Sequence, residues 1–165
     1  MKIALSTDHT GLCYGGIYEA LKSHIESLGH ETIDFGPKQL DMTDDYPDFI
    51  LPAAQAVATN QAQAGIILGG SGQGEAMAAN RIKGVRCTVF YGPAVAKNSV
   101  DAEGHVSRDP YEILRLSRQH NHANMLSLAS RFLDFEEAKK AVEIWLATPY
   151  SNSPRHLRRI KKLDA

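Results

Sequence analysis

The residues best suited to chemistry lie in a glycine-rich stretch near the middle of the chain. A short apolar run at 66–68 is followed by Gly69-Gly70-Ser71-Gly72-Gln73-Gly74-Glu75 and then by a helix-favouring run at 76–80. Glycine lets backbone N–H groups approach a ligand closely, and a helix N-terminus attracts negative charge. The stretch therefore predicts an anion-binding loop between a strand and a helix. It departs from the dinucleotide pattern G-x-G-x-x-G, and Glu75 stands where a triphosphate-binding loop needs Lys.

Glu75 has two interpretations. An acidic residue in the first turn of a helix commonly does no more than complement the helix dipole. The glycines before it favour a general base instead, because a base that works beside an oxyanion needs backbone donors close by. We also expect the dipole to favour the ionised form of Glu75, which would keep it a proton acceptor near neutral pH.

Four further segments carry polar groups that could bind an anion or move a proton. They are Asp8-His9-Thr10-Gly11, Arg118-Gln119-His120-Asn121-His122-Ala123-Asn124, Ser130-Arg131 and the basic stretch 155–162. Three of them also have a structural explanation: loop formers at 8–11, a polar helix cap at 118–124 and a solvated face at 155–162. On a helix, Arg155 and Arg159 would share a face and could grip one phosphate. A nucleic-acid surface is less favoured, because the basic stretch has no interleaved aromatic residues.

The sequence does not favour a metal site. Asp41, Asp44 and Asp45 lie in one loop, but they lack the glycine and terminal Glu of a calcium loop, so we expect solvated turn residues. The imidazole-rich segment lacks Cys and acidic partners at zinc-ligand spacing. Cys13 and Cys87 do not form a C-x-x-C motif and are expected to be small buried hydrophobes.

Apolar periodicity predicts alternating strands and helices. Strands are expected at 2–6, 31–35, 64–68, 85–91 and 125–129, and helices at 15–28, 48–59, 76–80, 110–119 and 135–147, with another helix starting at Ser153-Pro154. Strands that are apolar on both faces indicate an α/β fold with a five-stranded parallel sheet between two layers of helices. Ligands bind such sheets beyond the carboxyl ends of the strands, near a switch in strand order. The segments 7–11, 69–75 and 130–131 all follow strands.

Length and composition indicate one compact domain. The chain has 165 residues, 43% of them hydrophobic, and a formal net charge of -1. The longest apolar runs have the length of strands, and a strand begins directly at the N-terminus. We therefore expect no signal peptide, no membrane contact and a cytoplasmic location.

Five motifs, in their order along the chain, resemble the motifs of one protein family. They are Asp8-His9-x-Gly11; Gly70-Ser71-Gly72-x-Gly74-Glu75 with Ala78-Ala79-Asn80; Arg118-Gln119-His120-Asn121; Ser130-Arg131; and Arg155-His156 with Arg159. Over nearly its whole length the chain is similar to the type B ribose-5-phosphate isomerases, which are grouped with the galactose 6-phosphate isomerase subunits. The resemblance implies a Rossmann-like three-layer sandwich, an aldose–ketose isomerase of phosphorylated sugars, and no metal or nucleotide cofactor.

The resemblance also implies which residue is the base. Many members use a Cys at the position that Gly69 holds here, which excludes a cysteine mechanism for this chain. Other members use a Glu at the position of Glu75, and this chain resembles that branch. Cys87 is not expected to act as the base in place of that Cys.

Further roles are implied in the same way. His120 would open the sugar ring, with Asp8 and Asn121 positioning hydroxyl groups. Ser71 and the backbone N–H groups of Gly70, Gly72 and Gly74 would stabilise the enediolate oxygen. The phosphate would be held by His9, Arg131, Arg155 and Arg159. The first choice of reaction is ribose 5-phosphate to ribulose 5-phosphate.

The resemblance further implies a shared active site. His120, Asn121 and Arg131 would reach the glycine loop of a neighbouring subunit, so that a homodimer or a dimer of dimers is the active unit. Residues 1–150 would form the isomerase domain, and the basic helix or tail at 151–165 would contribute to the phosphate site.

One segment departs from the family pattern. Residues 92–109 form a long polar stretch where typical members have a short loop. It would be a lid or dimer-interface element that tunes sugar length, or a solvated insertion without a role, and His105 within it is given no catalytic role.

Rival functions are isomerisation of six-carbon sugar phosphates (allose or galactose 6-phosphate), isomerisation of four-carbon sugar phosphates, and a non-catalytic phosphosugar-binding module. Glu75 and His120 together argue against the last.

Overall fold

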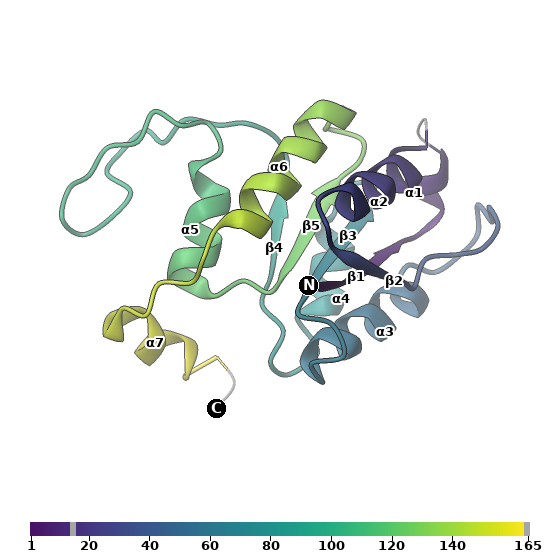
Figure 1. Ribbon diagram of the computed structural model, residues 1–165, viewed down its shortest axis with the longest axis horizontal. Coiled ribbons are helices and arrows are strands. Elements are labelled where there is room, and N and C mark those ends of the chain that lie inside the picture. Colours follow the sequence, from purple (N-terminus) through teal and green to yellow (C-terminus); the bar gives the residue numbers. More distant parts are fainter. Residues whose placement is uncertain (14–15, 164–165) are drawn as a thin grey trace.

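The structure is a computed structural model that describes residues 1–13 and 16–163 (Figure 1). Its elements are β1 (Lys2–Thr7), α1 (His9–Cys13), α2 (Ile17–Ser27), β2 (Glu31–Asp34), α3 (Pro47–Ala58), β3 (Ala64–Gly69), α4 (Gln73–Ala79), β4 (Cys87–Phe90), α5 (Glu112–Asn121), β5 (Met125–Ala129), α6 (Phe135–Ala147) and α7 (Pro154–Ile160). Within the described residues, five strands form one parallel sheet in the order β2-β1-β3-β5-β4. The predicted α/β class and five-stranded parallel sheet are confirmed.

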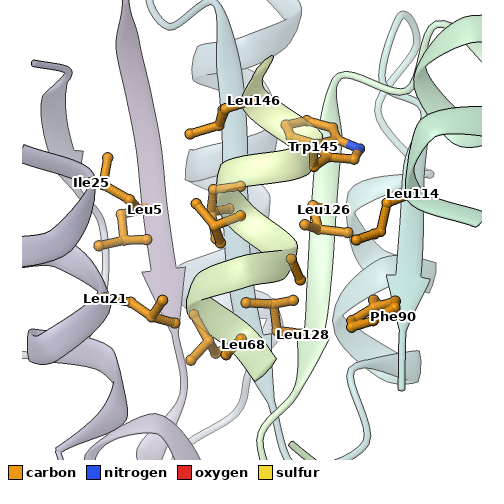
Figure 2. Packing of buried hydrophobic residues seen from close by; sticks show 14 of the residues in the cluster. Leu5, Leu21, Ile25, Leu68, Phe90, Leu114, Leu126, Leu128, Trp145 and Leu146 are labelled. Carbon is orange, nitrogen blue, oxygen red and sulfur yellow. The ribbon is translucent and has the colours of Figure 1, made fainter. Parts of the chain in front are cut away.

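Two layers of helices cover the sheet. On one face, Leu21 of α2, Leu114 of α5 and Trp145 of α6 join a buried cluster with sheet residues. On the other face, Ile50 of α3 and Ala76 of α4 belong to a second buried cluster. Figure 2 shows the first cluster, with side chains of β3 and β5 packed against α6. Both faces of the sheet are therefore buried beneath helices, as is typical of a parallel sheet.

The burial of the central strand β3 explains the uninterrupted apolar run at 66–68 in the sequence. All six of its residues are buried. Ile66 and Leu68 belong to the cluster beneath α6, whereas Ile67 between them belongs to the cluster beneath α3 and α4. Successive side chains of a strand point to opposite faces, so a strand covered on both faces needs apolar residues at every position.

The helix α1 was not predicted, because its sequence was interpreted as a loop. Asp8 precedes it, and the Asp8 carboxylate accepts hydrogen bonds from the backbone N–H (2.9 Å) and the hydroxyl (2.5 Å) of Thr10. This is the role of a helix N-cap, which short polar side chains fill well. Gly15, the expected start of the next helix, lies outside the described residues, and α2 is described from Ile17.

Other boundaries moved by a few residues, and one of these shifts matters for the site. The helix expected at 110–119 runs instead over α5 (Glu112–Asn121), so His120 and Asn121 lie in its last turn. His122 ends the helix in the left-handed conformation (φ 48°), and its N–H donates to the Arg118 carbonyl at 3.0 Å. The strand expected at 85–91 is the shorter β4, and the helix expected at 76–80 begins earlier, so that Glu75 lies in the first turn of α4.

Strand order places the polar segments at two different edges of the sheet. The chain goes from β1 to β2 on one side and returns to β3 on the other, so the switch in strand order lies between β1 and β3. The segment after β1 and the glycine loop after β3 meet there, at the side of the sheet where the parallel strands have their carboxyl ends. We call this side the carboxyl edge and the opposite side the amino edge. The helix α5 runs back from β4 to the start of β5, so its last turn lies at the amino edge. The five residues of β5 span about 17 Å at roughly 3.3 Å per residue, which measures the distance between the two edges.

None of the described helices combines the length and the apolar composition that crossing a bilayer requires.

Candidate active site

The glycine loop is fixed to the end of β5 by its carbonyl oxygens. Hydrogen bonds run from the backbone N–H and hydroxyl of Ser130 to Gly69 O (2.9 Å each), from the Arg131 N–H to Gly70 O (3.2 Å) and from the Ser127 hydroxyl to Gly72 O (2.7 Å). These bonds turn the loop carbonyls towards β5. They also give Ser127 and Ser130 a structural role that the sequence did not reveal.

Each glycine of the loop makes room for a specific neighbour. A Cβ atom at Gly70 would lie 3.0 Å from the Arg131 guanidinium, and one at Gly74 would lie 3.0 Å from the Tyr46 ring. Gly72 has a positive φ of 71°, which favours glycine, and its Cα faces Ser127. The glycines therefore serve close packing as well as backbone freedom.

Gly69 makes room for Glu75. A Cβ atom at position 69 would lie 1.9 Å from the carboxyl carbon of Glu75 and 2.1 and 2.3 Å from its two oxygens. The carboxylate thus occupies the volume that any side chain at position 69 would fill. A residue larger than glycine at 69 and this position of Glu75 therefore exclude each other.

Burial dominates the electrostatics of Glu75. Only 5% of the residue is exposed, and burial raises the pKa of its carboxyl group, with Asp8 adding to the rise and Arg131 and His9 opposing it. The expectation that the helix dipole keeps this pKa low is wrong, because the cost of desolvating the charge is larger. A carboxyl group with a raised pKa suits a group that both takes up and returns a proton.

Next to Glu75, His9 is held by a residue that the sequence did not single out. Asp44 accepts the backbone N–H of His9 through Oδ2 (2.9 Å), and its Oδ1 lies 2.5 Å from Nδ1 of the His9 ring. The Asp44 side chain is 7% exposed, so the expectation of a solvated turn residue is wrong for Asp44. Asp45 is exposed, as expected. A separation of 35 residues hides such a pair from any local pattern.

The carboxyl edge therefore gathers most of the predicted site. It holds Asp8, His9, Gly70, Ser71, Gly72, Gly74, Glu75 and Arg131. Ser71 is exposed there, and its hydroxyl oxygen accepts the N–H of Gln73 at 3.3 Å. Arg131 corrects one expectation, because its guanidinium lies against Gly70 of its own chain rather than reaching out to a neighbour.

His120 lies in a second polar cluster at the opposite edge. With Arg155, His156 and Arg159 of the α7 region and with residues 99–103, it lines a cavity of about 440 Å³. The rings of His120 and His156 are 4.2 Å apart between centroids. Burial, with the nearby His156 and Arg155, lowers the pKa of His120 below its usual 6.5. Asn121 and Thr88 both line two other cavities.

Arg118 explains why α7 lies beside α5. It is 7% exposed and is stacked between the rings of Trp145 and Tyr150, at 4.4 and 4.3 Å. Its guanidinium donates to the carbonyls of Thr148 (3.2 Å) and Ala123 (2.6 Å). These contacts fix the connection between α6 and α7, and Arg118 is therefore a structural member of its motif.

The predicted residues thus form two groups that one chain keeps apart. Glu75, at the start of α4, follows the carboxyl end of β3, and His120, at the end of α5, precedes the amino end of β5. The first group has the Glu75 carboxyl group, the glycine loop and one guanidinium group. The second has the His120 imidazole and two further guanidinium groups. Fold and site together define a parallel α/β protein with a buried carboxyl group beside a glycine-rich loop.

Comparison with known proteins identifies the family. The model of the Ribose/Galactose Isomerase family matches residues 3–104 and 108–163, and the break falls inside the long segment 92–109. Ribose-5-phosphate isomerase B of Mycolicibacterium paratuberculosis is 34% identical over 160 residues, which is 97% of this chain and 87% of that protein. The chain belongs to the ribose/galactose isomerase family.

Solved structures agree with this assignment. Ribose-5-phosphate isomerase B of Clostridium thermocellum superimposes with a TM-score of 0.82 at 30% identity, covering 99% of this chain and 95% of that one. The Mycoplasma genitalium enzyme, solved with bound ribulose-5-phosphate, has a TM-score of 0.82 at 32% identity and covers 99% and 93%. The Rossmann-like sandwich that the resemblance implied is confirmed.

The contact between Gly69 and Glu75 predicts the effect of Gly69→Ala. The added methyl group must push the carboxylate out of its position, so we expect the pKa of Glu75 to fall towards the ordinary value as the group becomes solvated. Overpacking should also lower the free energy of unfolding by about 1–3 kcal/mol. Side-chain NMR titration, with Glu75→Gln to assign the signal, measures the first effect, and urea unfolding measures the second. An unchanged Glu75 titration in a folded Gly69→Ala protein would contradict the steric argument.

Proposed function

We propose that this chain is an aldose–ketose isomerase of phosphorylated sugars that interconverts ribose 5-phosphate and ribulose 5-phosphate. The observation that carries the proposal is the buried Glu75 carboxylate, packed against a glycine loop and flanked by His9 and Arg131. Membership of the family and the likeness to an enzyme solved with bound ribulose-5-phosphate support it.

Glu75 would move the proton that the reaction requires. It takes the proton from C2 of the open-chain aldose, which leaves an enediolate, and returns it to C1, while the hydroxyl proton passes from O2 to O1. The developing negative charge on oxygen needs fixed donors, which the N–H groups of the loop at 70–74 and the Ser71 hydroxyl would supply. Loss of one such donor costs on the order of 3 kcal/mol in other enzymes.

The second group would complete the site from a neighbouring copy of the chain. One chain keeps His120 at the amino edge, about 17 Å of strand away from Glu75. A homodimer, or a dimer of dimers, in which the α5 and α7 ends of one copy face the carboxyl edge of the other would bring them together. His120 then opens the sugar ring, Asp8 and Asn121 position its hydroxyl groups, and α7 (Pro154–Ile160) contributes Arg155 and Arg159 to the phosphate site.

Substitutions separate proton transfer from binding. We expect Glu75→Gln to lower kcat by about 10²–10⁴-fold with little change in KM, and to abolish exchange of the C2 proton in deuterated water. Arg159→Ala should weaken sugar-phosphate binding by about 10–100-fold, because a charge-assisted hydrogen bond is lost. Arg158→Ala is the matched control, since Arg158 is exposed and lies outside the cavity lining. Retained exchange in Glu75→Gln, or equal losses in the two arginine variants, would refute these roles.

Mixing two inactive variants tests the shared site. Glu75→Gln and His120→Gln subunits, unfolded together and refolded, form mixed dimers in which one site has both native residues and the other has neither. Random pairing makes half of the dimers mixed, so about one quarter of the native activity should return. Each variant refolded alone is the control. A mixture as inactive as its parts would show that Glu75 and His120 do not act across two subunits.

The segment 92–109 favours a second candidate function. Its tip at 99–103 lines the cavity of His120, and a hydrogen bond from the Val100 N–H to His105 O (2.8 Å) closes the tip into a turn. Asp101 accepts the N–H groups of Glu103 and His105, at 3.0 Å each. A wall placed there would set the length of sugar that fits, which supports a six-carbon or four-carbon sugar phosphate as the rival substrate.

Shortening this segment tests its role. We expect replacement of residues 96–107 by two glycines to change the ranking of kcat/KM across aldose phosphates of four, five and six carbons, because one wall of the cavity is lost. Native protein assayed with the same panel gives the reference ranking. Unchanged kcat/KM for all sugars would identify a solvated insertion without a role.

A further inference from the structure

We propose that Asp44 is a positioning residue that holds His9 as a fixed cation for the phosphate of the substrate. The inference rests on the proposed function, because it gives a role to the partner of a proposed phosphate ligand. The observation behind it is a pair of contacts from one carboxylate to both the backbone and the ring of His9.

The geometry fixes both the place and the orientation of the His9 ring. One oxygen of Asp44 binds the N–H of His9 at the start of α1, and the other binds Nδ1 at 2.5 Å. The two nitrogens lie on opposite sides of an imidazole, so Nε2 points away from Asp44. With Nδ1–H donating to the carboxylate, a second proton on Nε2 makes a donor that Asp44 cannot itself use.

The charges around His9 favour this protonated form. The hydrogen bond to Asp44 raises the pKa of His9 above 6.5, and Asp8 adds to the rise, whereas burial and Arg131 oppose it. Asp8 belongs to the turn after β1, with its carboxylate 3.8 Å from Nδ1 of His9. Asp41 of the 36–46 loop and Glu75 of α4 also interact with the His9 charge. An imidazole with a pKa near 6.5 would be only about one quarter protonated at pH 7, so the pairing matters for binding a dianion.

A metal site explains the same cluster less well. Asp8, His9 and Asp44 each offer an atom within 4.8 Å of the others. However, ions with nitrogen and oxygen ligands sit about 2.0–2.2 Å from each, and the 2.5 Å between Nδ1 and Oδ1 is a hydrogen-bond distance that leaves no room for an ion between them.

The test compares Asp44→Asn with Asp45→Asn in the full chain. Asp45 is the matched control because it is the next residue, carries the same charge and is exposed. NMR titration of the His9 ring, assigned with His9→Gln, should give a pKa above 6.5 in the native protein and in Asp45→Asn, and at or below 6.5 in Asp44→Asn. Inorganic sulfate is the binding probe, because it remains a dianion from pH 6 to pH 8.

We expect Asp44→Asn to bind sulfate about tenfold more weakly than the native protein at pH 8 and with a much smaller difference at pH 6, following the loss of charge from His9. Asp45→Asn should stay within about twofold of the native protein. In the isomerase assay, Asp44→Asn should raise KM for the sugar phosphate at pH 8 more than it lowers kcat. In the His9→Gln background, Asp44→Asn should have no further effect on sulfate binding.

Three results would overturn the inference: a native His9 pKa at or below 6.5, an unchanged His9 titration in folded Asp44→Asn, or equal sulfate binding by the two Asn variants at pH 8. The first does not require Asp44→Asn, so it decides the matter even if Asp44→Asn does not fold. These outcomes differ from failure of the proposed function, which would be a native protein that binds sulfate in an Asp44-dependent way but isomerises no sugar phosphate.

Discussion

The contact between the Glu75 carboxylate and the backbone of Gly69 is the constraint on which the site depends. Burying a carboxylate is unfavourable unless fixed polar groups surround it, and the chain places it over a loop whose carbonyls are already bound by the end of β5. The same loop must then leave space for Arg131 at Gly70 and for Tyr46 at Gly74. The glycine at position 69 and the raised pKa of Glu75 thus both follow from the burial of this carboxyl group against the main chain.

Parallel topology sets the second constraint. Each crossover returns the chain to the amino edge, so groups at the start and the end of a helix are separated by the height of the sheet. Glu75 begins α4 and His120 ends α5, and the contacts of Arg118 with the α6–α7 connection keep α7 at the edge where His120 lies. The shared site proposed above would bring both groups together without any change in the fold, and Arg118 would support it by holding α7 in place.

The sequence predicted what local patterns encode. The apolar residues of β3 indicated a parallel strand covered on both faces, and the glycines before Glu75 indicated a loop between a strand and a helix. What it missed depends on long-range packing. Asp44 meets His9 across 35 residues, and Ser127 and Ser130 bind loop carbonyls that lie more than 50 residues away. The pKa of Glu75 was misjudged for the same reason, since a helix dipole is visible in a local sequence but the depth of burial is not.

The shifted pKa values set a working range of pH for the proposed reaction. Glu75 must be ionised to accept a proton, which requires a pH above its raised pKa, and His120 is neutral above its lowered one. His9 must stay protonated, which requires a pH below its raised pKa. For stability the sign is different: Glu75 and His9 both have raised pKa values, so each favours the folded state below its unfolded pKa and loses that contribution as the pH rises through its folded pKa. The ionisation of Glu75 that makes it a base therefore also lowers the stability of the fold, whereas the charge on His9 serves stability and phosphate binding together.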